Sequence, residues 1–235
     1  MNRIQKLFSS THYQILEERR LAQILSSNFK GKRILDIGCG QGKYLRLLKN
    51  ISSEVTGVDV NSVQVESLRK EGFNAYTPDN LPAQKYDLLL MSHIVEHMAP
   101  EDLIAFMDKY LEMLEENGAL LLLTPMPGIR FWHDYTHIRP YTPQSIGMMF
   151  GILNGPVSFK PKNKLMLNEI WFFRDSWRIR NHRSYYPSPQ GNRDTFNRYL
   201  ILTINIVLAG LHAISRGRLG ILASWAGIYR KLPLS

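Results

Sequence analysis

Hydrophobic residues in the first 125 positions fall into short apolar runs that alternate with segments of helical spacing. Residues 13–28 carry apolar side chains at near-helical spacing, and a glycine-containing break follows at 30–32. The expected strands are 34–37, 55–60, 73–77, 88–91 and 119–124, and the expected helices between them cover 44–48, 63–71 and 100–116. Because short strands that alternate with helices are typical of βαβ units, we expect an α/β fold with a doubly wound, mostly parallel sheet.

The pattern changes after residue 125. Residues 125–143 combine prolines and glycines with aromatic and histidine residues, which predicts a long loop, and long loops in compact domains are usually functional. Residues 142–153 favour a further helix. Residues 157–173 favour the last two strands, antiparallel at the edge of the sheet.

Charge is distributed unevenly along the 235 residues. Up to residue 159 there are 16 Lys and Arg against 17 Asp and Glu, a net charge of −1, and beyond it there are 13 against 3, a net charge of +10. A near-neutral body with a basic tail indicates a tail that meets an anionic surface, and it argues against a nucleic-acid partner. We therefore divide the chain into a domain over 1–180 and a basic, apolar helical extension over 181–235.

The extension leaves two interpretations open. Residues 199–215 are uncharged and apolar nearly all round a helix, but 17 residues is marginal for a membrane span. With the surrounding arginines, residues 199–232 fit a helical hairpin on a membrane surface. The other interpretation is a helical pair that packs on the domain or forms a homodimer interface.

Cysteine content and the N-terminus bear on the compartment. Cys39 is the only cysteine, which excludes an internal disulfide framework and a Cys-rich zinc module. Residues 1–20 contain no apolar run of the signal-peptide type. We therefore expect a cytoplasmic protein, peripheral at the inner face of the membrane if the extension binds lipid.

A glycine-rich segment, Asp36-Ile37-Gly38-Cys39-Gly40-Gln41-Gly42, lies where an expected strand turns into a helix. Such a turn lets the backbone approach a ligand at the carboxyl edge of the sheet. A dinucleotide site requires its third glycine one residue later, and a P-loop requires Ser or Thr after the lysine, where Lys43 is followed by Tyr44. Neither phosphate motif therefore fits.

The segment D-x-G-x-G-x-G instead resembles motif I of the class I S-adenosylmethionine-dependent methyltransferases. Val58-Asp59, 86–90 and 116–121 resemble further segments of that family, in the same order. The resemblance covers about residues 30–160 and implies a Rossmann-like fold and S-adenosyl-L-methionine as cofactor, with Asp79 standing near the place where many members have an adenine-contacting Asp. The cofactor-binding residues that it implies are Asp36, Gly38, Cys39, Gly40, Gly42, Asp59, Val60, Asp79, Ser92 and His93.

Residues 93–97 spell H-x-x-E-H, the signature of inverted zinc proteases. That chemistry needs the motif inside a long helix, but here it begins at a strand end and Pro100 follows closely, so a zinc peptidase remains a remote alternative and no metal ion is expected. The segment also resembles the "(L/V)EH" segment of many small-molecule methyltransferases, which faces the methyl group. A further interpretation is that Glu96 or His97 caps the next helix.

The loop after the fifth strand is the second candidate site. Residues 134–143 resemble the "D-x-T-H-x-R-x-(Y/F)-(T/S)-P" segment of methyltransferases that accompany surface-polysaccharide and glycolipid assembly. An imidazole suits deprotonation of a hydroxyl near neutral pH, so His137 is the candidate base, with His93 and His97 as the other candidates. Substrate contacts are assigned to Trp132, His133, Asp134, Tyr135 and Arg139, with Arg139 for an anionic group; the alternative is that this lid only packs.

The absence of two motifs restricts the class of methyl acceptor. The segment after the fourth strand lacks the Asn/Asp-Pro-Pro-aromatic pattern of nucleic-acid amino methylation, and no cysteine is available for C5 methylation of a pyrimidine. We therefore expect in-line O-methylation of a small molecule, sugar or lipid-linked glycan, and no nucleic-acid partner. The alternative from another class is a non-catalytic Rossmann-like module that binds the cofactor without transferring methyl.

Overall fold

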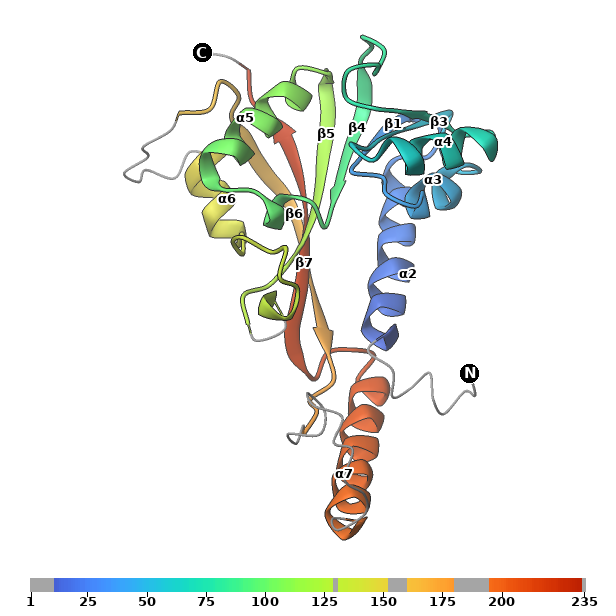
Figure 1. Cartoon of the computed structure of the whole chain (residues 1–235). Helices are drawn as coiled ribbons and strands as arrows, with labels where there is room; N and C mark the ends of the chain where they lie inside the picture. The colour runs from blue at the N-terminus through green and yellow to red at the C-terminus, as the bar shows by residue number, and fades with distance from the viewer. Residues whose placement is uncertain (1–10, 129–130, 152–159, 180–194, 234–235) are drawn as a thin grey trace. The chain divides into compact units, whose positions relative to one another are not determined.

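The computed structural model describes residues 11–128, 131–151, 160–179 and 195–233 (Figure 1). Its described residues form a seven-stranded sheet in the order β3-β2-β1-β4-β5-β7-β6. The strands are β1 (Arg33–Ile37), β2 (Glu54–Val58), β3 (Asn74–Tyr76), β4 (Tyr86–Ser92), β5 (Leu114–Pro125), β6 (Leu165–Asp175) and β7 (Ile221–Lys231). β1 to β5 pair in parallel and β7 pairs antiparallel with β5, which confirms the doubly wound sheet with an antiparallel edge.

Helices precede the sheet and connect its strands. They are α2 (Thr11–Asn28), α3 (Lys43–Leu48), α4 (Ser62–Lys70), α5 (Pro100–Leu111), α6 (Pro143–Phe150) and α7 (Thr195–Ile214), with short 3₁₀ turns η1 (Val95–His97) and η2 (Phe131–His133). Two starts are set by side chains: Asn61 accepts the first backbone N–H groups of α4, and Thr142 forms a capping box with Ser145 at α6.

The described residues belong to two compact units. One comprises residues 21–172 and 224–235, and the other comprises residues 1–20 and 173–223. In the first unit, Leu88 to Met91 of β4 and Leu120 to Leu123 of β5 are completely buried. Continuous apolar runs of this kind are expected of central parallel strands that are covered on both faces.

The boundary between α5 and β5 differs from the expected helix over 100–116. The helix ends at Leu111 and the strand begins at Leu114, which pairs with Tyr86 of β4. The pairing then shifts, so that Leu88 lies opposite Ala119, and residues 115–118 form an irregularity at the start of the strand. The last residues of the expected helix, 115 and 116, therefore lie in this irregularity of the strand.

The largest difference concerns the expected helical extension over 181–235. Residues 221–231 form β7, with Ser224 opposite Pro125 and Arg230 opposite Ala119, so the expectation of a helix is wrong for this part of the extension. A short, uniformly apolar run has no periodicity that separates a strand from a helix, and its aromatic and β-branched residues fit a buried strand.

The identity of β7 changes two further expectations. Trp225, Ala226 and Tyr229 are buried in the sheet, so the segment 224–231 is not available to the membrane surface expected over 199–232. Residues 157–173 were expected to supply two edge strands. They supply part of one, β6, and residues 152–159 lie outside the described part of the chain.

Candidate active site

The glycine-rich segment forms a turn between β1 and α3. Gly38, Gly40 and Gly42 have φ angles of +74°, +49° and +78°. A Cβ at Gly38 would lie 2.5 Å from Ile94 Cδ1, and one at Gly42 would lie 2.3 Å from Leu68 Cδ2. A Cβ at Gly40 would have no heavy atom within 4 Å. The turn is thus tightly packed at both ends and open in its middle, where a ligand can approach the backbone.

Asp59 lies directly after β2 and connects this turn to α4. Its Oδ2 accepts a hydrogen bond from Gly40 N at 2.8 Å, and its Oδ1 accepts one from Asn61 N at 2.8 Å. Each oxygen therefore keeps a further lone pair for another donor. The neighbouring Val60 side chain is 85% exposed. Two sequence-predicted residues, Gly40 and Asp59, are thus in direct contact.

Two ionisable groups are buried beneath the turn. Asp36 is 1% exposed, its Oδ2 has no hydrogen-bond partner, and burial raises its pKa to about 7, with the Asp59 charge adding to the effect. Burial, followed by the nearby Asp36 and Asp59 charges, also raises the pKa of the Cys39 thiol to about 12. Cys39 therefore stays a thiol at neutral pH and is no nucleophile.

The remaining residues assigned to the cofactor follow neighbouring strands. Asp79 is exposed in the turn after β3, where Asn80 N donates to Thr77 O at 3.0 Å. Ser92 ends β4, and its hydroxyl donates to Tyr44 Oη at 3.1 Å. Because β3, β2, β1 and β4 are adjacent and parallel, these residues share one edge of the sheet with the glycine turn.

His93 follows β4 in a strained backbone conformation. Its φ of +54° lies in the left-handed region, which is uncommon for a residue with a Cβ. Its backbone N–H donates to Leu123 O at 2.8 Å, and this bond joins the ends of β4 and β5. Its Nδ1 lies 3.3 Å from Oε1 of Glu96.

Glu96 is completely buried at the centre of η1. Its Oε2 accepts a hydrogen bond from Thr124 Oγ1 at 3.1 Å, whereas its Oε1 has no hydrogen bond. Its backbone oxygen accepts from the N–H groups of Ile138 and Arg139 at 2.8 and 3.2 Å, which fastens the loop after β5. Sequence reasoning assigned no site role to Glu96 or Thr124, although the H-x-x-E-H pattern marked the segment.

The geometry of residues 93–97 decides between the earlier interpretations. They form a strand end followed by a 3₁₀ turn, so the long helix that the zinc-protease signature requires is absent at this position. The N-cap of α5 is Ala99, without a side-chain cap, so neither Glu96 nor His97 caps that helix.

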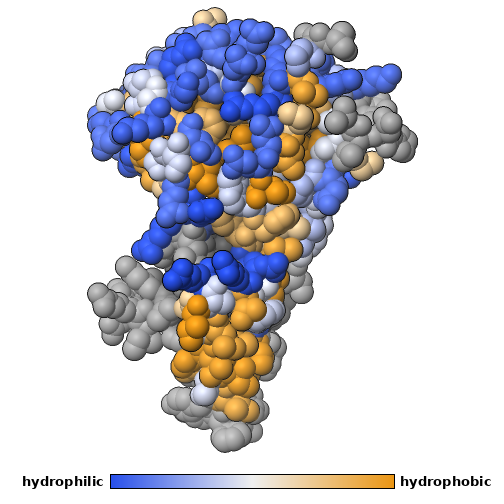
Figure 2. Space-filling model, turned by 180° about the vertical axis from the view of Figure 1, so that it is seen from behind, coloured by the Kyte–Doolittle hydropathy of each residue, from blue (hydrophilic) through white to orange (hydrophobic). Residues whose placement is uncertain are grey.

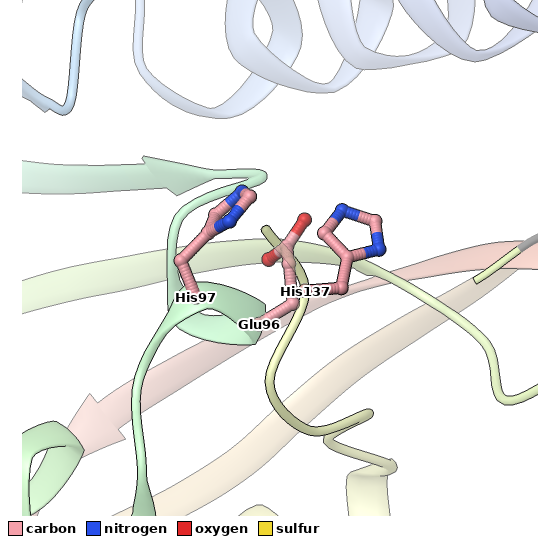
Figure 3. Close-up of side chains that lie close together, drawn as sticks. All are labelled: Glu96, His97 and His137. Atoms are coloured by element: carbon pink, nitrogen blue, oxygen red, sulfur yellow. The ribbon is translucent and has the colours of Figure 1, made fainter. Parts of the chain in front are cut away.

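His97 and His137 face each other beside Glu96 (Figure 3). Their ring centroids are 4.9 Å apart, in an edge-to-face arrangement. His97 Nδ1 lies 3.1 Å from Thr136 O, and His137 Nδ1 lies 2.7 Å from Phe131 O. The buried Phe131 ring also packs on His137, with 4.6 Å between centroids, a role that the sequence analysis did not assign.

Asp134 lies at the outer side of His137. Its Oδ2 is 3.8 Å from His137 Nε2, and its Oδ1 accepts hydrogen bonds from Thr136 N and Oγ1 at 3.0 and 2.6 Å. The hydrogen bonds from Thr136 hold the pKa of the Asp134 carboxyl below its ordinary value.

The other lid residues point outward. Trp132 and Tyr135 are 61% and 97% exposed, and His133 and Arg139 are exposed as well. Trp132 nevertheless packs edge-to-face on the buried Phe131, with 4.9 Å between the ring centroids, whereas the Tyr135 ring is left almost wholly exposed. A hollow of about 420 Å³ lined by Lys32, Asp87 and Glu115 lies at the amino ends of the parallel strands and includes none of the assigned residues.

Comparison with known proteins agrees with this architecture. Residues 10–190 match the family model described as "Methyltransferase domain". The chain is 34% identical to a ubiquinone biosynthesis O-methyltransferase of Chelativorans sp. (strain BNC1) over 106 residues, and this stretch covers 41% of each protein. It is 30% identical to the aklanonic acid methyltransferase DauC of Streptomyces sp. (strain C5) over 123 residues, and this stretch covers 46% of this chain and 54% of DauC.

Solved structures show a similar fold over nearly the whole chain. A SAM dependent methyltransferase from Archaeoglobus fulgidus shares 24% identity with a TM-score of 0.57, over 97% of both chains. The N-methyltransferase NodS from Bradyrhizobium japonicum shares 12% identity with a TM-score of 0.56, over 95% of this chain. These likenesses concern the fold, and the chain matches only about half or less of the length of the two curated relatives. On the family match, the chain belongs to the family of S-adenosylmethionine-dependent methyltransferase domains with a Rossmann-like fold.

Proposed function

We propose that the protein transfers the methyl group of S-adenosylmethionine to a hydroxyl oxygen of a small-molecule, sugar or lipid-linked glycan acceptor. The observation that carries this proposal is the group of His93, His97 and His137 beside the glycine turn. Ile94, between these histidines in the chain, would be only 2.5 Å from a Cβ at Gly38, so the two regions are in contact. Imidazoles next to a methyl-donor site suit removal of a hydroxyl proton.

The glycine turn and its neighbours fit the cofactor. The open middle of the turn at Gly40 leaves room for the ligand, and Asp59 keeps lone pairs for two ribose hydroxyls. The buried Asp36 carboxyl, with its unpartnered Oδ2, has a pKa raised to about 7, and a cationic ligand bound beside it would favour its ionised form. Val60 and Asp79 are assigned to the adenosine part, and Ser92 and His93 to the end that carries the methyl group.

The bound cofactor supplies a methyl carbon on a sulfonium: this carbon bonds to the acceptor oxygen while the carbon–sulfur bond breaks and sulfur keeps the electron pair. The chain holds the two reactants in line. The hydroxyl proton passes to an imidazole. Because a carbonyl oxygen only accepts, His137 Nδ1 carries the hydrogen that faces Phe131 O, and its Nε2 has the lone pair for that proton.

The exposed lid residues provide the contacts to the acceptor. Trp132 and Tyr135 offer exposed aromatic faces, which suit the apolar face of a sugar or an aromatic ring. Arg139 suits a phosphate or carboxylate on the acceptor. An oxygen acceptor also agrees with the name of one relative, an O-methyltransferase of ubiquinone biosynthesis.

We also propose that α7 lies on an anionic membrane surface. In Figure 2, hydrophobic residues gather over α7. Arg216 and Arg218 follow it, in the part of the sequence that has 13 basic against 3 acidic residues. Among the described residues, no helix is both long enough and apolar enough to cross a bilayer. The exposed apolar residues of α7 are Leu200, Leu202, Ile206, Val207, Leu211 and Ile214.

Substitution tests the membrane proposal better than truncation, because β7 belongs to the sheet. The full chain with Val207→Asp and Ile214→Asp should float less with anionic liposomes than the unchanged protein. Met148→Asp, at an exposed apolar residue of α6, is the control. Equal flotation, or loss of a dimer without any effect on flotation, would contradict the proposal.

The methyl-transfer proposal is tested with labelled S-adenosylmethionine and a panel of acceptors. The panel holds small phenols and alcohols, free sugars and a lipid-linked glycan extract, with amine analogues as the control for N-methylation. We expect label on a hydroxyl acceptor. Calorimetric binding of the cofactor without transfer to any acceptor would instead support the non-catalytic module.

A further inference from the structure

Three side chains with donor atoms for a metal ion gather where η1 meets the loop after β5. Glu96, His97 and His137 each offer one such atom, and the three atoms lie within 4.8 Å of one another. Figure 3 shows the Glu96 carboxylate between the two imidazole rings. The residues come from two segments far apart in the chain, and the bonds from Ile138 N and Arg139 N to Glu96 O hold them together.

The two histidines are oriented as metal ligands are. Both Nδ1 atoms face a backbone carbonyl oxygen, Thr136 O for His97 and Phe131 O for His137. Each Nδ1 therefore carries the ring hydrogen, and each Nε2 keeps its lone pair for another partner. Metal-binding histidines commonly donate their other ring N–H to a carbonyl or carboxylate in this way, which fixes the tautomer and the ring plane.

Glu96 gives a second, independent indication. Its side chain is completely buried, yet only Oε2 has a hydrogen bond, from Thr124. Oε1 has none and lies 3.3 Å from His93 Nδ1. A buried carboxylate is costly unless a cation or several donors compensate its charge. A cation between Glu96 and the two imidazoles would do so.

We propose that Glu96, His97 and His137 bind one divalent transition-metal ion such as Zn²⁺ or Mn²⁺. Imidazole nitrogens favour such ions over Mg²⁺ and Ca²⁺, which prefer oxygen ligands throughout. Two histidines and one glutamate are a known donor set of catalytic zinc sites, which leave a position open for a substrate. Since metal–ligand bonds are about 2.0–2.2 Å long, the three side chains close around the ion on binding. The sequence alone had led us to expect no metal.

The coordination position that the three side chains leave open gives the ion a role in catalysis, and this role rests on the proposed function. The acceptor hydroxyl binds there, and the ion lowers the pKa of that hydroxyl, as divalent ions do for bound water. The proton leaves to water, since the lid residues beside the ion are exposed. The oxygen then forms the bond to the methyl carbon, and sulfur keeps the electrons of the broken bond. His137 holds the ion in this arrangement, in place of taking the proton.

Binding of the ion is measured first, without any acceptor. The full-length protein is treated with a chelator, dialysed and titrated calorimetrically with ZnCl₂, MnCl₂ and MgCl₂. We expect one ion per chain, with Zn²⁺ or Mn²⁺ bound at least about tenfold more tightly than Mg²⁺. Co²⁺ should give visible absorption bands that report nitrogen and oxygen ligation.

Three variants connect the ion to these side chains. His97→Ala and Glu96→Gln should abolish tight binding and the Co²⁺ bands, whereas His133→Ala, in the same loop but outside the cluster, should retain both. Circular dichroism shows whether each variant is folded, and His97→Gln replaces a variant that is not. Absence of tight binding, or binding that is unchanged in folded His97 and Glu96 variants, overturns the proposal.

The failure of this inference differs from the failure of the proposed function. If methyl transfer continues undiminished after chelation, the metal site is refuted while O-methylation stands. If the ion binds through Glu96 and His97 but no hydroxyl acceptor takes up label, the proposed reaction is refuted while the metal site stands.

Discussion

The glycine turn and the histidine cluster lie at the same edge of the sheet, but they are built in different ways. The turn uses backbone groups of consecutive residues, 38–42, which donate hydrogen bonds to Val58 O and to the Asp59 carboxylate at the end of β2. The cluster of Glu96, His97 and His137 uses side chains from two segments, held together by backbone bonds to Glu96 O. The turn thus depends on local conformation and the cluster on docking of a loop, so substitutions should affect binding and chemistry separately.

The largest expected effect is on turnover, from His137→Ala. Whether His137 accepts the proton or holds an ion, its loss should lower the rate of methyl transfer by about 10²- to 10⁴-fold. Cofactor affinity should not change, because the glycine turn does not depend on this side chain. Initial rates with labelled cofactor and calorimetry on the same preparation measure both quantities. Equal rates in the variant would remove His137 from the chemistry.

Asp59→Ala is expected to act on the other quantity, the affinity for the cofactor. Hydrogen bonds to a carboxylate contribute about 1.5–3 kcal/mol each, so cofactor affinity should fall at least about tenfold. Calorimetry with S-adenosylmethionine measures this, and Glu116→Ala, an exposed carboxylate beyond the other edge of the sheet, is the matched control. Persistent tight binding would mean that the cofactor lies elsewhere.

Smaller effects, on the free energy of unfolding, distinguish Gly42 at the packed end of the turn from Gly31, where an added Cβ would have open space around it. Gly42→Ala should lower the free energy of unfolding by about 2–4 kcal/mol, because φ is +78° and the new Cβ would lie 2.3 Å from Leu68 Cδ2. Gly31→Ala, with φ of +71° and nothing within 4 Å, should cost only about 1–2 kcal/mol. Urea unfolding compares the two, and equal losses would show that the contact with Leu68 has no effect.

The last expected effect is a change in the pH dependence of stability, from Asp36→Asn. The pKa of the Asp36 carboxyl is about 7 in the fold, against 3.8 ordinarily. The folded state therefore binds this proton more tightly than the unfolded chain does, and the protein loses stability as pH rises from about 4 to about 7. The variant lacks this titration, so its free energy of unfolding should fall less over that range. Identical pH slopes in urea unfolding would contradict the assignment.

The features that could be predicted from the sequence are those with a local cause. The strands around Asp36 and Leu88, the cap at Asn61 and the left-handed glycines follow from apolar runs and from residue types with narrow conformational preferences. Each of these signals lies within a few residues of its effect.

Features that depend on distant pairing could not be predicted. The run around Trp225 has no helical or alternating period, and its partner β5 lies about 100 residues earlier in the chain. The orientation of His97 and His137 depends on the carbonyl oxygens of Thr136 and Phe131, and backbone atoms leave no mark in the residue pattern. The buried state of Glu96 depends likewise on the docked loop.

The position of β7 has a consequence for the synthesis of the protein. β5 pairs with β4 on one side, and among the described residues its other side is paired by β7 alone, whose last residue is Lys231. While a ribosome is still adding these residues, β5 presents unpaired backbone groups to other chains. Folding of this sheet is therefore completed only after residues 221–231 have emerged, and a nascent chain that stalls before this point is the form most exposed to aggregation and to chaperones.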